Sequence, residues 1–203
     1  RGLGDVYKRQ AVGIICLIGF LMGVIIAFET ALVAQIFGAV IFVVNGIGIA
    51  MTRELGPLMT AILFAGRSGS AFAAQLGTQK VNEELNALTT FGLSPMYFLV
   101  VPRLIASSLV VPLLSVFATI LGILGGGLVM AMYDITYTQF YVQLLKSVTV
   151  TDIVFGLVKA VIFGFVIALI GCQCGMNTGA GAAAVGSSTT KSVVKSIIWI
   201  VVI

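Results

Sequence analysis

Three charged side chains lie inside otherwise apolar sequence and are the residues best placed to do chemistry. Arg53 and Glu54 are adjacent, and Arg67 follows within the same apolar segment. A charge at membrane depth is costly, so such residues are candidates for a functional site. Because neighbouring side chains on a helix point about 100° apart, Arg53 and Glu54 need further partners. Two interpretations stay open: a structural polar contact inside a helix bundle, and a polar gate beside an apolar cavity that holds an amphiphile.

Arg67 allows two roles as well. Its guanidinium could contact the phosphate of a lipid headgroup, or it could extend along the helix to the membrane interface. The chain has no histidine, and Cys16, Cys172 and Cys174 all lie in apolar segments. We find no nucleophile beside a base, no metal-ligand cluster and no nucleotide-binding loop. The sequence therefore predicts neither an enzyme nor a cofactor bound by this chain.

The composition predicts a membrane protein. Of 203 residues, 60% are hydrophobic and 9% are charged, with a mean hydropathy of +1.18, whereas about 25% of residues are charged in soluble domains. Without the first ten residues the net charge falls from +4 to +2, with 8 basic and 6 acidic residues. Such ordinary loop charge gives no case for nucleic acid. We expect an all-α integral membrane protein with about five transmembrane helices.

The hydrophobic pattern divides the chain into successive spans. Residues 1–10, RGLGDVYKRQ, differ in composition from the apolar run that begins at Ala11, and we interpret them as a non-native leader outside a single transmembrane domain at 11–203. Gly56-Pro57 predicts a kink in the second span, and residues 175–196 are expected to be a loop of small residues. A last span from Val193 to Ile203 is too short to cross about 30 Å of hydrocarbon, so we expect it to be truncated. The predicted spans are residues 11–34, 38–76, 95–132, 153–174 and from 193 onward.

Small residues recur every fourth position after the Gly56-Pro57 pair. Two such ladders are expected to let another helix approach closely. The ladders are Ala65, Gly69, Ala73 and Gly77, and Gly66, Ser70 and Ala74.

Residues 77–94 form the first clearly polar segment and predict a short amphipathic helix. Val81, Leu85 and Leu88 would share its apolar face, while Lys80 and Glu84 form an i, i+4 pair on its polar side. Basic residues in short loops mark the cytoplasmic side, and Lys80, Arg103, Lys191 and Lys195 flank two connections that would face the cytoplasm. An amphipathic helix there indicates a docking surface for a partner.

Two motifs resemble a known family. The segment RELGPLMTAILFAGRSGSAFAAQLGTQKVNEELNALTTFGLSPMYFLVVPRLIA, from Arg53, is similar to the signature region of MlaE-type permeases, the membrane subunits of ABC lipid transporters. The later GMNTGAGAAAVGSSTTKSVVKS resembles the loop of that family before its last helix. Two features depart from the family pattern: the N-terminal interfacial helix is replaced by RGLGDVYKRQ, and the last span is incomplete.

The resemblance implies a permease of the bacterial inner membrane that forms a homodimer. Its partners would be a cytoplasmic ABC ATPase, which hydrolyses ATP, and an MCE-domain protein outside the membrane. Phospholipid or a related lipid would occupy a cavity between the two copies, near Arg53 and Glu54. The segment from Thr78 to Phe91 would lie against the ATPase. The residues that we expect to couple to the ATPase are Lys80, Val81, Glu84, Leu85 and Leu88.

Two other classes of function stay open. An ion-coupled secondary transporter or a channel-forming subunit would place charges at membrane depth, but such transporters often contain inverted repeats. We find no convincing repeat between residues 11–95 and 95–203. Transport driven by a proton gradient without ATP would favour this alternative. A subunit with a purely structural role in assembly would carry no bound lipid.

Overall fold

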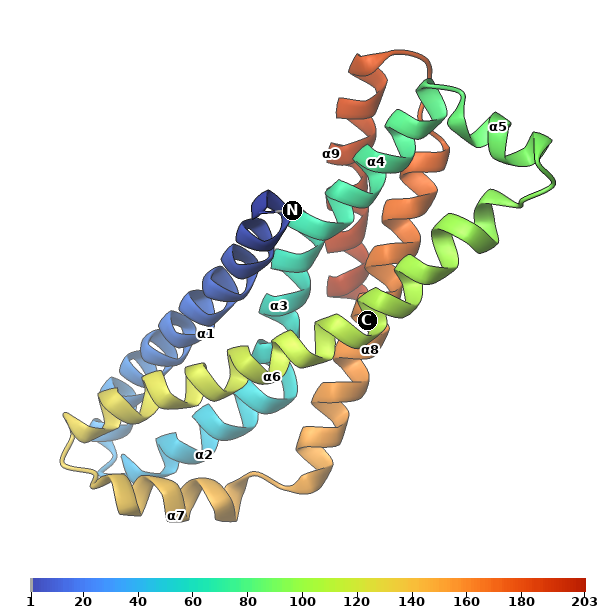
Figure 1. The fold of residues 1–203 in the computed structure, drawn as a ribbon. Coiled ribbons are helices and arrows are strands. Elements are labelled where there is room, and N and C mark those ends of the chain that lie inside the picture. The colour runs from blue at the N-terminus through green and yellow to red at the C-terminus, as the bar shows by residue number, and fades with distance from the viewer. Residues whose placement is uncertain (1) are drawn as a thin grey trace. The chain divides into compact units, whose positions relative to one another are not determined.

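The computed structural model describes the backbone of residues 2–203 and the side chains from Val12 onward. Every secondary-structure element in this part of the chain is helical, which confirms the predicted all-α class (Figure 1). The elements are α1 Gly2–Ile36, α2 Ile41–Ala50, α3 Gly56–Phe64, α4 Ser70–Val81, α5 Glu84–Thr90, α6 Val101–Ala131, α7 Tyr137–Ser147, α8 Val150–Met176 and α9 Ala182–Val202, with π-helical turns η1 Met51–Leu55, η2 Ala65–Gly69 and η3 Met96–Val100. The predicted leader, residues 1–10, lies outside the described side chains, and its origin stays a prediction.

Four helical segments of the described residues are long and apolar enough to cross a bilayer, as a multi-pass membrane protein requires. They are Val12–Ile36, Ile41–Val81, Met96–Ala131 and Val150–Met176. The first four predicted spans therefore coincide with these segments, with boundaries shifted by a few residues.

A π-helical turn lies directly before Gly56-Pro57, where the sequence predicts a kink, and the bend itself stays a prediction. The N–H of Gly56 donates to the carbonyl of Met51, five residues earlier, at the end of η1. Before Pro102, the N–H of Val101 donates to Met96 in the same way at the end of η3. Proline lacks an N–H and its ring crowds the preceding turn, and a π turn inserted before it is one way to relieve that crowding. Helical structure therefore continues through both prolines.

The chain divides into two compact units. The first unit comprises the chain up to Thr60 together with Leu113–Lys159, and the second comprises Ala61–Pro112 and Ala160–Ile203. Helices α3, α6 and α8 each contribute residues to both. In the first unit, a buried apolar cluster joins α1, α2, α6 and α7. Its fully buried members are Ala27, Ala31, Val44, Ile47 and Met130.

Glycines allow α1 and α6 to pack closely in the first unit. A Cβ added at Gly19 would lie 2.6 Å from the carbonyl oxygen of Ala118, and one at Gly125 would lie 2.5 Å from that of Phe20. Real Cβ atoms do not approach backbone so closely. The two backbones are therefore in direct contact, as small residues permit in membrane helices.

The first small-residue ladder packs α4 within the second unit, as predicted. Its four members, from Ala65 to Gly77, are buried. A Cβ at Gly171 of α8 would lie 2.8 Å from the Gly69 oxygen, and the hydroxyl of Ser192 on α9 donates to that same oxygen at 3.3 Å. The second ladder lies on a more exposed face, and nothing contacts a Cβ built at Gly66.

The loop predicted at residues 175–196 was wrong over most of its length. Helix α9 begins at Ala182, after Gly181 at φ 92°, rather than near Val193. Alanine is the strongest helix former, and Ser188, Ser192 and Ser196 bury one face of α9. Small polar residues indicate a loop in sequence, but here they let the 21-residue α9 pack against α4 and η2. At about 1.5 Å per residue this helix is about 30 Å long.

Candidate functional site

Arg53 and Glu54 belong to a network of four charged side chains in the first unit. Arg53 Nη1 lies 3.6 Å from Asp152 Oδ1, and its Nε lies 3.8 Å from Glu54 Oε1. Lys159 Nζ donates to Glu54 Oε2 at 2.5 Å. Two positive and two negative groups therefore alternate from Asp152 to Lys159, and their charges balance.

The network joins η1 to the first part of α8. Asp152, Phe155 and Lys159 are spaced i, i+3 and i+7, so they share one helix face. The Arg53 guanidinium also lies 5.3 Å from the Phe155 ring centroid, within the range of a cation–π contact. The sequence analysis did not predict Asp152, Phe155 and Lys159 as partners of Arg53 and Glu54. An anion, an aromatic ring and a cation on one face of an apolar helix could have indicated this site.

The members of the network differ in how exposed their side chains are. The side chains of Arg53 and Glu54 are 49% and 53% exposed, whereas that of Asp152 is only 13% exposed. Asp152 therefore anchors the network inside the unit. Arg53 and Glu54 keep atoms accessible to a further polar group, because their internal partners cover only part of each side chain.

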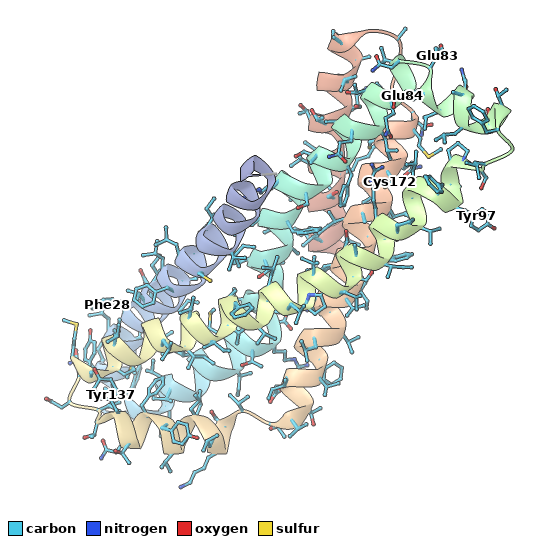
Figure 2. The ribbon with its side chains drawn as sticks, viewed as in Figure 1. Phe28, Glu83, Glu84, Tyr97, Tyr137 and Cys172 are labelled. Atoms are coloured by element: carbon cyan, nitrogen blue, oxygen red, sulfur yellow. The ribbon has the colours of Figure 1, made fainter. Side chains whose placement is uncertain are left out.

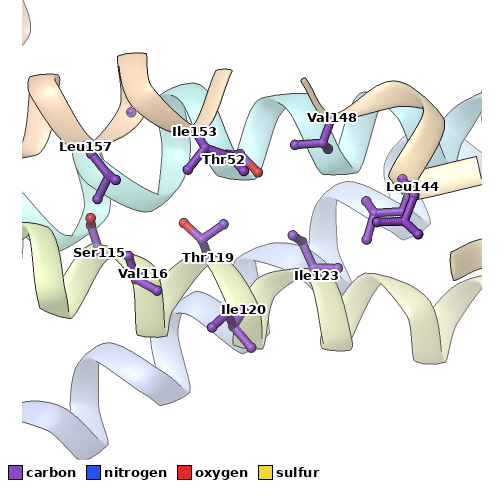
Figure 3. A pocket seen from close by; sticks show the side chains of 12 residues that line it. Thr52, Ser115, Val116, Thr119, Ile120, Ile123, Leu144, Val148, Ile153 and Leu157 are labelled. Carbon is purple, nitrogen blue, oxygen red and sulfur yellow. The ribbon is translucent and has the colours of Figure 1, made fainter. Parts of the chain in front are cut away.

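An apolar cavity of about 280 Å³ adjoins this network in the same unit (Figure 3). The hydroxyl groups of Thr52, Ser115 and Thr119 are the polar groups in a wall that is otherwise aliphatic. Thr119 donates to the carbonyl of Met51 at 3.2 Å, so its hydroxyl is already engaged. The aliphatic wall consists of Val116, Ile120, Ile123, Leu144, Leu145, Val148, Ile153 and Leu157, with Gly156 between the last two.

Gly156 connects the cavity to the charges. A Cβ built there would lie 3.6 Å from the Arg53 Cα and closer still to the backbone of Thr52. Helix α8 thus contacts η1 backbone to backbone, and this contact brings Asp152 and Lys159 to Arg53 and Glu54. One side of α8 lines the cavity while the adjacent side carries the charges.

The predicted coupling segment is present in the second unit but is divided in two. Helix α4 ends at Val81, and Glu83, at φ 61°, precedes the seven-residue α5. Lys80 therefore does not face Glu84 along one helix: its Nζ donates to the Met176 carbonyl at 2.8 Å. The predicted Lys80–Glu84 pair was wrong because an i, i+4 pair needs an unbroken helical turn.

The apolar residues of this segment face the protein rather than solvent. Leu85 is buried, and Val81 and Leu88 are half-buried. The exposed surface of α5, the turn after it and the start of η3 carries acidic and aromatic side chains. Figure 2 labels two of them, Glu84 and Tyr97, and Phe91 lies between these two in the sequence. Phe91 and Tyr97 are 80% and 79% exposed.

Arg67 is not a member of the charge network, since it belongs to η2 of the second unit. Its side chain is half-buried and interacts with neighbouring groups of the chain. Its contact with a lipid headgroup stays a prediction.

The sequence of residues 6–203 matches the family model described as Permease MlaE. A probable ABC transporter permease protein of Rickettsia typhi is 34% identical over 191 residues, covering 93% of this chain and 73% of the relative. One from Synechocystis is 38% identical over 180 residues, covering 88% of this chain and 68% of the relative. The chloroplastic protein TRIGALACTOSYLDIACYLGLYCEROL 1 of Arabidopsis thaliana is 39% identical over 155 residues, covering 76% of this chain and 44% of the relative. The family match includes both the charge network and the coupling segment.

Proposed function

The chain belongs to the MlaE permease family, and we propose that it is the subunit of an ABC transporter that carries phospholipid or a related diacyl lipid. The permease role follows from the family and from relatives named as ABC transporter permeases. The lipid substrate is supported by the Arabidopsis relative, whose name refers to trigalactosyldiacylglycerol, a lipid with two acyl chains.

The observation that carries this proposal is the apolar cavity beside the four-charge network. An amphiphile needs an apolar wall for its acyl chains and polar groups for its headgroup, and the first unit places both on η1 and α8. An acyl chain gains little from the cavity while it is still in the bilayer, because lipid tails are as apolar as leucine. Outside the bilayer, each methylene exposed to water costs about 0.8 kcal/mol. The cavity would remove that cost during transfer.

The charged side chains would position the headgroup. Arg53 and Lys159 offer guanidinium and ammonium donors to a phosphate, which Arg binds with two parallel hydrogen bonds. The carboxylate of Glu54 accepts from Lys159 and would also accept from glycerol or sugar hydroxyls. Because the network is neutral in itself, it would bind a headgroup by exchanging partners rather than by carrying excess charge.

A second copy of the chain would complete the site. Ile120 and Leu145 line the cavity yet are 50% and 62% exposed. We propose that a homodimer covers this open wall, which places the lipid between the two copies.

Partner proteins would supply the energy for transport and accept or deliver the lipid. The sequence contains no nucleotide-binding motif, so ATP hydrolysis would take place on a cytoplasmic ABC ATPase, and an MCE-domain protein would exchange lipid outside a bacterial inner membrane. The exposed surface formed by Glu84, Phe91 and Tyr97 is the docking face that we propose for the ATPase. Lys80 lies on the same continuous helical segment as Arg53, Ile41–Val81, which offers a mechanical path from docking face to lipid site.

The lipid site is tested by filling the cavity. Ile120→Trp adds a large ring to a lining position, whereas Leu124→Trp adds the same ring to an exposed position on α6 outside the lining. In proteoliposomes that contain the full chain with its ATPase, we expect Ile120→Trp to reduce ATP-dependent transfer of a fluorescent phospholipid at least tenfold. Leu124→Trp should transfer lipid normally. Equal transfer by both variants would contradict the assignment of the cavity.

The partners are tested separately by native mass spectrometry of the full chain co-expressed with its ATPase. Two permeases, two ATPases and retained phospholipid support the proposed assembly. A folded permease that transports with a proton gradient and without ATP would instead support the ion-coupled alternative.

A further inference from the structure

A second, polar cavity lies in the other unit, between the end of α8 and the residues of α9 up to Lys195. Its volume is about 220 Å³. Its composition contrasts with the apolar cavity, since amides, hydroxyls and ammonium groups form most of its wall. The polar lining side chains are those of Gln173, Asn177, Thr178, Ser187, Ser188, Lys191 and Lys195.

Two lysines give this cavity its charge. Lys191 and Lys195 are spaced i, i+4 on α9, so they project from one helix face. Like charges at this spacing destabilise a helix, and the described lining contains no carboxylate to offset them. Neither ammonium forms an ion pair among the residues that the structure describes.

The other charged residues of the second unit do not neutralise Lys191 and Lys195. Its residues, 61–112 and 160–203, carry a net charge of +3. Its acidic residues, Glu83 and Glu84, lie at the start of α5 rather than in the cavity wall. The charged groups of this unit are Arg67, Lys80, Arg103, Lys191 and Lys195 against Glu83 and Glu84.

The floor of the cavity is held in place by buried hydrogen bonds. Thr178, 3% exposed, shares a 3.0 Å hydrogen bond with the hydroxyl of Ser188 and donates to the Cys174 carbonyl at 3.2 Å. The Thr178 side chain is also in tight contact with Gly77 of α4. These contacts fix the turn between α8 and α9, whereas the side chains of Gln173, Asn177, Lys191 and Lys195 are exposed and accessible to a ligand.

We propose that this cavity binds a phosphate-bearing anion, through Lys191 and Lys195 with hydrogen bonds from Asn177 and Gln173. A phosphate group supplies the negative charge that the wall lacks and accepts several hydrogen bonds at once. Basic pockets between membrane helices bind anionic lipid headgroups in this way.

The position of the cavity gives the site a role separate from that of the Arg53 network. Lys80 donates to the carbonyl of Met176, the last residue of α8. The polar cavity therefore lies at the same end of the second unit as α5, the segment that we propose contacts the ATPase. The anion would come either from the headgroup of an anionic lipid in the adjacent leaflet or from free phosphate in solution.

The test uses the single tryptophan of the chain, Trp199, one turn beyond Lys195 on α9 and 54% exposed. The full chain is placed in phosphatidylcholine bilayers with increasing brominated phosphatidylglycerol, whose bromines quench tryptophan nearby. We expect phosphatidylglycerol to be preferred about tenfold or more. In the double variant Lys191→Gln and Lys195→Gln this preference should disappear. It should persist in Lys191→Arg with Lys195→Arg, and in the control Lys146→Gln on α7.

A calorimetric titration of inorganic phosphate into the chain in neutral detergent distinguishes the source of the anion. Lipid preference that depends on both lysines assigns the site to a headgroup. Phosphate binding that depends on them, without lipid preference, assigns it to free phosphate. The proposal is overturned if neither probe binds, or if Lys146→Gln weakens binding as much as the double variant does.

Discussion

The ion pair between Glu54 and Lys159 can be tested by exchanging its charges. We consider three variants of the full chain: Glu54→Lys, Lys159→Glu, and both together. Each single change places like charges where the structure has a 2.5 Å contact. The double change restores opposite charges at that contact but leaves a cation beside Arg53, whose Nε is 3.8 Å from Glu54.

The loss of stability in each variant can be estimated from the distance between the two charges and from the exposure of their side chains. Two unit charges about 4 Å apart interact by about 4 kcal/mol at an effective dielectric constant of 20 and by about 1 kcal/mol in water. With side chains 29% and 53% exposed, we take about 1–2 kcal/mol for the pair. Reversing one sign changes attraction into repulsion, so each single variant should lose about 2–4 kcal/mol. The double variant should recover at least half of that loss.

The midpoint temperature of thermal unfolding measures these losses of stability. A loss of 1 kcal/mol lowers the midpoint by about 2–4 °C for a chain of this size, so a loss of about 2–4 kcal/mol should lower the midpoint of each single variant by about 4–16 °C. Cys172 and Cys174 are buried free thiols, and a thiol-reactive fluorophore would label them as the protein opens. Lys146→Glu, at an exposed site on α7, is the control for a change of net charge. If the two single losses add in the double variant, the ion pair does not stabilise the protein.

Three further variants test packing and docking. Gly171→Ala places a Cβ 2.8 Å from the Gly69 oxygen and should destabilise the chain by about 1–3 kcal/mol. Gly186→Ala on α9 meets open space and should gain up to about 1 kcal/mol; equal midpoints would refute the contact between η2 and α8. Phe91→Asp should abolish co-purification of the ATPase, while Tyr141→Asp on α7, equally a charged replacement of an exposed ring, should not. Leu85→Asp should lower stability as well as association, because Leu85 is buried, and an unchanged midpoint would contradict its packing role.

The amino-acid sequence by itself determined the class of the protein, the first four spans and the family. Apolar segments of about 20 residues are long enough to cross a bilayer as helices, and that signal depends on composition and length alone. The ladder from Ala65 to Gly77 was also predictable, because side chains four residues apart on a helix share a face whatever the partner is.

Tertiary structure decided which groups meet. The sequence marked Arg53 and Glu54 as needing partners, but Lys159 reaches Glu54 from 105 residues away, and no local periodicity encodes such a contact. Gly156 makes the contact because it lets α8 touch η1. Likewise α9 is helical from Ala182 because its buried serines pack against α4. Spacing along the chain fixes which face a residue occupies, whereas packing between helices fixes what that face contacts.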